Sequence, residues 1–179
     1  DHVPAAKIPY VSLLSDLMGS MNTAARSYVD LDNEIGCHMG GMNISTSALH
    51  KLDDSFIPRM NVSAKFLSEE TEKALEIIRE VLLTTDFSDI NRFREILDEE
   101  IAGMEDGMMQ SGNRTATSRV LSYFSAYNAY IQKISGIDYY RFLKDIRESL
   151  KTDAPAVLEQ LKETADIILR TDNLRIRLT

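Results

Sequence analysis

Three histidines and one cysteine are the residues of this chain best suited to hold a metal ion, but their spacing does not suit a shared site. His2, His38 and His50 lack the i, i+4 separation by which one helix face presents two imidazoles to one ion. Soft donors also gather at Cys37, His38, Met39 and Met42. Because consecutive residues of a helix point in different directions, a copper or zinc site there is a minor alternative. The residues therefore predict no metal ligand.

Carboxylates, serines and glycines offer other chemistry, and none of it forms a recognisable site. The adjacent acids Asp53-Asp54 and Glu99-Glu100 have the side chains of general acid–base catalysts, but such pairs usually form a solvated face of a turn or helix. The serines include no Gly-x-Ser-x-Gly motif, and Gly40-Gly41 lacks the rest of a phosphate-binding loop. By itself this pattern predicts no catalytic residue and no cofactor site.

Period-two alternation marks the stretch around which the other elements are expected to pack. Apolar side chains alternate with Asn, Ser and Lys over residues 42–48 and again over 60–66, so each run is predicted to be a strand with one apolar and one polar face. The polar connection at 51–55, followed by Pro58, favours an antiparallel pair. Residues 174–178, Leu-Arg-Ile-Arg-Leu, alternate in the same way and are predicted to form a third strand.

Most of the remaining chain has helical periodicity, with apolar residues three and four apart. The sequence therefore predicts an α+β fold in two layers, a small antiparallel sheet with several helices packed on one face. The fourth helix is expected to bend near Gly107 or Gly112, and residues 123–130 are interpreted as an aromatic-rich connection. Helices are predicted over residues 8–18, from Ser27 to Gly40, over 69–83 after Ser68, from Ser88 to residue 121, from Asp138, and from Asp153 with Pro155.

Length and charge limit the classes of function. A chain of 179 residues is the size of a single domain. With 28 acidic against 20 basic residues and a net charge of -8, it lacks the positive surface that nucleic-acid binding requires. No apolar run has the length of a membrane span, and a single cysteine fits a reducing compartment. The absence of an initial methionine and the small number of strands suggest a fragment of a longer protein.

An ordered set of sequence blocks resembles the pitrilysin/insulinase type of zinc metallopeptidase, and more narrowly its presequence-protease branch. The blocks are residues 8–19 (IPYVSLLSDLMG), 27–28, 31–41 (LDNEIGCHMGG), 61–65 (NVSAK), 119–125 (RVLSYFS) and 136–143 (GIDYYRFL). They extend over nearly the whole chain.

The resemblance implies a domain without the zinc site. Members of the family have four similar α+β domains in two halves, which enclose a chamber for unfolded peptides, and the first domain carries an inverted His-x-x-Glu-His signature. Setting Met18-Gly19-Ser20 against the Met-Gly-Thr that follows this signature puts the ligand positions at Tyr10, Leu13 and Leu14, which cannot bind zinc. Residues 1–179 would then be one non-catalytic domain, the third, whose N-terminal strands are missing, and zinc would belong to another domain of the parent protein.

The resemblance also implies partners and a location. The expected partners are the other domains of the same protease and an unfolded peptide substrate, with no nucleic acid or membrane, and the fragment is expected to self-associate. The bacterial cytoplasm or an organellar matrix is the expected location. Polar strand residues would line the chamber, namely Asn43, Ser45, Asn61, Lys65, Arg175 and Arg177. A stand-alone scaffold or interaction module that pairs through an open sheet edge is the alternative.

Overall fold

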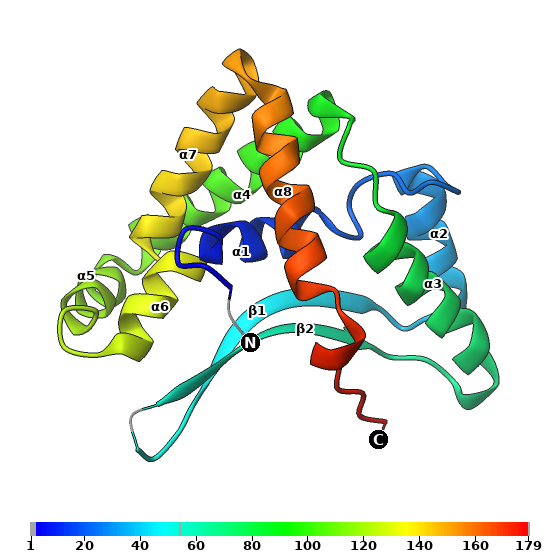
Figure 1. Ribbon diagram of the computed structural model, residues 1–179, viewed down its shortest axis with the longest axis horizontal. Coiled ribbons are helices and arrows are strands. Elements are labelled where there is room, and N and C mark those ends of the chain that lie inside the picture. The colour runs from blue at the N-terminus through cyan, green and yellow to red at the C-terminus, as the bar shows by residue number, and fades with distance from the viewer. Residues whose placement is uncertain (1–2, 54, 179) are drawn as a thin grey trace.

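The computed structural model describes residues 3–53 and 55–178, and it confirms an α+β fold of two layers. Within these residues a two-stranded antiparallel sheet lies under eight α-helices, and no α-helix covers the other face of the sheet (Figure 1). The elements are α1 (Ile8–Leu17), α2 (Tyr28–His38), β1 (Met42–His50), β2 (Phe56–Ala64), α3 (Thr71–Thr84), α4 (Ile90–Gln110), α5 (Gly112–Leu121), α6 (Ala126–Ser135), α7 (Ile137–Thr152) and α8 (Ala154–Ile168). Short 3₁₀ turns occupy Ser68–Glu70 and Thr171–Asn173.

The register of the two strands puts residues of like polarity on the same face. Met42 lies opposite Ala64 and Ile44 opposite Val62, and Met42, Ile44 and Ala64 pack against the buried core. The intervening positions form a polar face, in which Asn43 lies opposite Ser63. This is the alternation predicted for residues 42–48 and 60–66, because successive strand residues point to opposite faces.

Helix α1 lies at the centre of the core, between the sheet and the other helices. Its Leu13, Leu14 and Leu17 are fully buried. The buried Ser12 hydroxyl forms a hydrogen bond of 2.8 Å with the Thr46 hydroxyl of β1, which satisfies both polar groups at the contact between α1 and the sheet. A helix that is apolar around most of its surface is typical of such a buried position.

Several helix boundaries follow the predicted capping residues. The side chains of Ser27 and Asp153 accept hydrogen bonds from backbone N–H groups in the first turns of α2 and α8. The long fourth helix breaks at Ser111, next to Gly112, so the bend was correctly placed.

Three helix predictions need correction. Asp89, not Ser88, caps α4, because the Ser88 hydroxyl instead donates to Asp86 at 2.9 Å. Ser68 begins a 3₁₀ turn and makes no side-chain cap. The aromatic stretch is not only a connection, since Ser125 caps α6 and residues 126–130 are helical.

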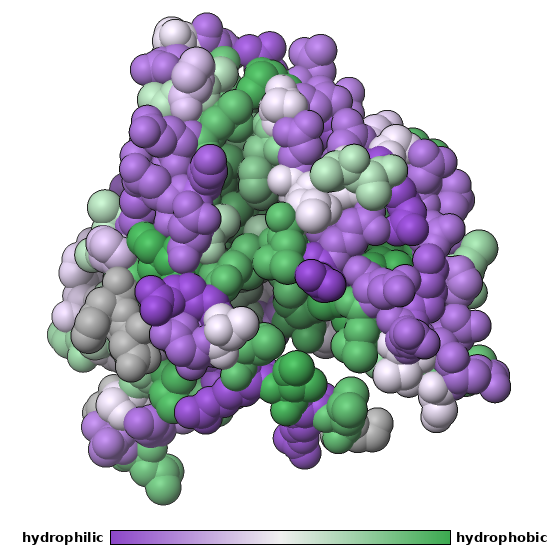
Figure 2. Space-filling view, turned by 45° about the vertical axis from the view of Figure 1, so that its right-hand side comes forward, coloured by the Kyte–Doolittle hydropathy of each residue, from purple (hydrophilic) through white to green (hydrophobic). Residues whose placement is uncertain are grey.

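The predicted third strand is wrong. Residues 174–178 have no regular structure, and their apolar side chains are exposed, Leu174 by 60%, Ile176 by 72% and Leu178 by 72%. In the described parts of the chain no strand lies beside this segment, so its backbone has no hydrogen-bonding partner with which to form a sheet. Figure 2 shows apolar groups at the lower end of the molecule, where this segment leaves the helices.

Candidate functional site

The polar face of the strand pair is the strongest candidate site, because amide and hydroxyl groups are concentrated on a face that no α-helix of the described residues covers. Ser45 lies opposite Asn61. The Asn61 side-chain amide donates to the Ser47 hydroxyl at 2.8 Å, and the Asn43 amide donates to the Ser45 hydroxyl at 3.4 Å. These bonds orient the side chains along the face while leaving acceptor and donor capacity for another molecule.

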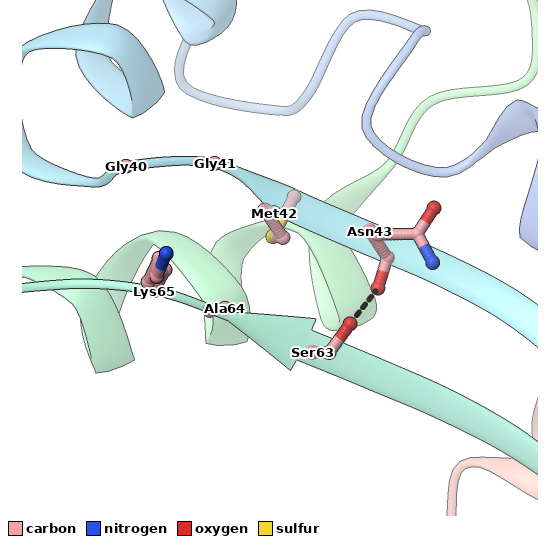
Figure 3. Close-up of a pocket in the computed structure, with 7 residues that line it drawn as sticks. All are labelled: Gly40, Gly41, Met42, Asn43, Ser63, Ala64 and Lys65. Carbon is pink, nitrogen blue, oxygen red and sulfur yellow. Dashed lines mark hydrogen bonds between the residues drawn. The ribbon is translucent and has the colours of Figure 1, made fainter.

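A groove of about 290 Å³ lies at the end of this face, where the chain enters β1 and leaves β2 (Figure 3). Gly40 and Gly41 form one wall, Lys65 lies opposite, and the Gly40 N–H donates to the Lys65 carbonyl at 2.6 Å. Gly41 has φ of 130°, a conformation that favours glycine. The Ser63 hydroxyl donates to the Asn43 carbonyl at 3.4 Å, so Ser63 and Asn43 close the groove across the strands.

The structure brings together four of the six residues proposed to line a chamber. Asn43, Ser45 and Asn61 occupy the polar face, and Lys65 continues the same alternation one position beyond β2. The other two, Arg175 and Arg177, lie in the exposed C-terminal segment and not in the sheet.

An acidic recess adjoins the groove, and sequence reasoning did not find it. Its volume is about 480 Å³, and Met42 and Asn43 line both the recess and the groove. The carboxylates around the recess come from three helices, namely Asp16 of α1, Asp32 of α2, and Glu99 and Glu100 of α4. The available signal was Asp16, an acid within an otherwise apolar and uncharged helix, while Glu99-Glu100 was interpreted as a solvated pair.

Asp16 has the most perturbed carboxyl group among the described residues. Burial raises its pKa to about 7, and the nearby charge of Glu100 adds to the rise. The Tyr139 hydroxyl of α7 donates a short hydrogen bond to the Asp16 carboxylate, which acts in the opposite direction. Burial also raises the pKa of Tyr139, and the Asp16 charge contributes to that increase. Asp16 and Tyr139 therefore share a proton-sensitive contact at the back of the recess.

The residues do not suit a zinc ion. In the described parts of the chain, no three His, Cys, Asp or Glu side chains converge as metal ligands. His38 bonds through Nδ1 to Glu70 at 2.8 Å, His50 stacks on Tyr127 at 4.8 Å between ring centroids, and Cys37 is exposed. At the positions that correspond to the family's zinc ligands, Leu13 and Leu14 are core residues and Tyr10 packs edge-on against Phe142. We derive no chemistry through a metal here.

The helices were also compared with the requirements of a membrane span. Within residues 3–53 and 55–178, no helix combines the necessary length with sufficient apolarity.

Comparison with known proteins identifies the family. Residues 1–146 match the family described as associated with peptidases of the M16 family, subfamily C, and the chain belongs to this family of peptidase-associated domains. It is 38% identical over 176 residues to Protein HypA of Clostridium perfringens, a match that covers 97% of this chain and 18% of that protein. The mitochondrial presequence protease of Schizosaccharomyces pombe is 22% identical over 174 residues, covering 96% of this chain and 17% of that protein.

A plant relative extends the same pattern. Presequence protease 1 of Arabidopsis thaliana, described as chloroplastic/mitochondrial, is 21% identical over 174 residues, covering 96% of this chain and 16% of that protein. These matches confirm the resemblance to the presequence-protease branch. The chain spans less than one fifth of the length of each of these relatives.

Proposed function

We propose that this chain is a non-catalytic domain that forms part of the wall of the peptide chamber in a larger zinc metallopeptidase. The zinc site would lie in another domain of the same protein. The observation that carries the proposal is the polar face of β1 and β2, on which Asn43, Ser45, Asn61 and Lys65 lie together without an α-helix of the described residues over them. Residues 1–179 would act as one domain of this assembly.

The chemistry of this face suits an unfolded peptide. An extended peptide exposes backbone N–H and C=O groups, which need partners when water is excluded. Side-chain amides and hydroxyls both donate and accept, so Asn61 and Ser45 would bond to a peptide backbone without reading its sequence. Such contacts suit a protease that accepts many substrates.

The acidic recess supports a preference for basic peptides. Asp16, Asp32, Glu99 and Glu100 surround it, and it opens beside the groove at Met42 and Asn43. A cleft lined by charges of one sign attracts ligands of the opposite sign. Two relatives are described as presequence proteases, one mitochondrial and one chloroplastic/mitochondrial. We propose a positively charged, unfolded peptide as the substrate, and an organellar matrix or the bacterial cytoplasm as the location.

The first experiment examines the chain alone. The purified 179-residue chain is assayed for zinc by elemental analysis and for cleavage of a long unfolded peptide. We expect substoichiometric zinc and no cleavage. Stoichiometric zinc together with chelator-sensitive cleavage would overturn the non-catalytic assignment.

The second experiment examines the polar face in the full-length polypeptide. We expect Asn61→Ala to lower kcat/KM for a long unfolded peptide by about 3- to 10-fold, the range that corresponds to one lost hydrogen bond. Lys162→Ala is the matched control, because Lys162 is exposed on α8, away from the strands. Circular dichroism checks that both variants fold. An unchanged kcat/KM in folded Asn61→Ala protein would show that this face does not contact the substrate.

A further inference from the structure

The two outer edges of the β1–β2 pair differ in their capacity to accept another strand. In an antiparallel pair, residues that exchange hydrogen bonds alternate with residues whose N–H and C=O groups point outward. The Lys65 N–H donates to the Gly41 carbonyl at 3.0 Å, and the Lys51 N–H donates to the Ser55 carbonyl at 2.8 Å. These bonds mark the odd-numbered residues of β1 as those paired with β2. The even-numbered residues of β1 therefore direct their backbone groups to the outer edge.

The outer edge of β2 carries a block. Pro58 lies opposite Ala48, an even-numbered residue, so Pro58 occupies an outward position on β2. Proline has no N–H group, and an edge proline is a common obstacle to strand addition.

The outer edge of β1 has no comparable block. Ile44, Thr46 and Ala48 all have an N–H group, and β1 contains no proline, lysine, arginine or carboxylate. Among residues 3–53 and 55–178, no hydrogen bond engages the outward backbone groups of these three residues. An unprotected edge of this kind is a template for another strand.

We propose that the outer edge of β1 pairs with a strand supplied by the rest of the same polypeptide. This inference rests on the proposed function, in which the chain is one domain of a longer peptidase, and the chain spans only 16 to 18% of the relatives described above. The incoming strand would place apolar residues beside Ile44, under the helices, and polar residues beside Ser45. It would widen the polar face as well as complete the sheet.

The C-terminal segment supports an occupant from the same polypeptide. Residues 174–178 alternate apolar and basic side chains as a strand does, and the exposed apolar side chains Leu174, Ile176 and Leu178 have no sheet to join in the described structure. A two-stranded sheet is marginal by itself. Together, the open edge and the unpaired segment indicate one sheet that is incomplete without further strands.

Amide hydrogen exchange at single-residue resolution tests the proposal. Exchange is compared between the 179-residue chain and the full-length polypeptide, each at concentrations where it is monomeric. We expect the outward amides of Ile44, Thr46 and Ala48 to exchange at least about tenfold more slowly in the full-length protein. The inward amides of Ser45 and Ser47, already bonded to β2, are the internal control. Equal exchange of the outward amides in the two proteins would overturn the proposal.

A variant pair provides an independent test. Ala48→Pro removes an outward N–H and no bond to β2, so the variant chain should fold with a melting temperature near that of the parent chain. In the full-length protein the same change should raise the exchange rates at Ile44 and Thr46, whereas Ala48→Ser, which retains the N–H, should not. If Ala48→Pro leaves those rates unchanged, no strand occupies this edge.

Other occupants give different results. Protection that arises only after an unfolded peptide is added would assign the edge to substrate, and protection that is lost on dilution of the full-length protein would assign it to a second copy. Either result overturns the proposal. Peptidase activity of the same sample separates the two levels: an active enzyme with unprotected β1 amides refutes only this inference, while an inactive one with protected amides refutes only the proposed function.

Discussion

Replacement of Asp16 by asparagine should change how the stability of this chain depends on pH. The pKa of Asp16 rises from an ordinary value of 3.8 to about 7 on folding, mainly because the carboxyl group is buried between α1 and α7. The folded state therefore holds this proton more tightly than the unfolded state does. Between pH about 4 and 7 the free energy of unfolding should fall as the pH rises, and the contribution should be lost above pH 7.

The size of the effect follows from the same shift. Each pH unit of difference in pKa corresponds to about 1.4 kcal/mol, so the rise at Asp16 corresponds to up to about 4 kcal/mol across the window. Asparagine has no carboxyl group to ionise, and its side-chain carbonyl can still accept the hydrogen bond from Tyr139. We expect Asp16→Asn to resemble the parent chain near pH 4 and to exceed its stability at pH 8.

Urea denaturation between pH 4 and pH 8.5, followed by far-ultraviolet circular dichroism, measures this difference; the chain has no tryptophan for fluorescence. Asp166→Asn, an exposed position on α8, is the matched control and should follow the parent profile. Parallel pH profiles for the parent chain and Asp16→Asn would refute the argument that burial makes Asp16 proton-sensitive.

Two further expectations concern packing and association. Gly136→Ala should destabilise the chain by about 1 to 3 kcal/mol, because the new Cβ would lie 2.7 Å from the backbone Cα of Gln132. Gly103→Ala in α4, where a Cβ meets no atom within 4 Å, should instead stabilise it by about 0.5 to 1 kcal/mol; similar urea midpoints for the two would contradict this. The chain should self-associate in sedimentation velocity as its concentration rises, and Ile176→Ser should weaken this by removing an exposed apolar side chain. A monomer at all concentrations would refute the second expectation.

Much of the fold could be predicted because its signals are local. Alternation over residues 42–48 and 60–66 depends only on the pleat of a strand, so both strands and their polar faces were correct, and with them the positions of Asn43, Ser45 and Asn61. Ser27 and Asp153 were correct as caps for the same reason. Predictions failed where local signals compete, as where Asp86 engages the hydroxyl of Ser88 and leaves Asp89 to cap α4.

Only the tertiary structure decided features that depend on residues far apart in the chain. The alternation of residues 174–178 is that of a strand, but a strand also needs a neighbour, and the described structure supplies none. The acidic recess combines residues of three helices, which no spacing in the sequence reveals. Asp16 is an ordinary acid by sequence, and its pKa is perturbed because packing buries it beside Tyr139, 123 positions away. The sequence alone determined which face of each element is polar, whereas packing determined which polar groups meet and how strongly burial changes their chemistry.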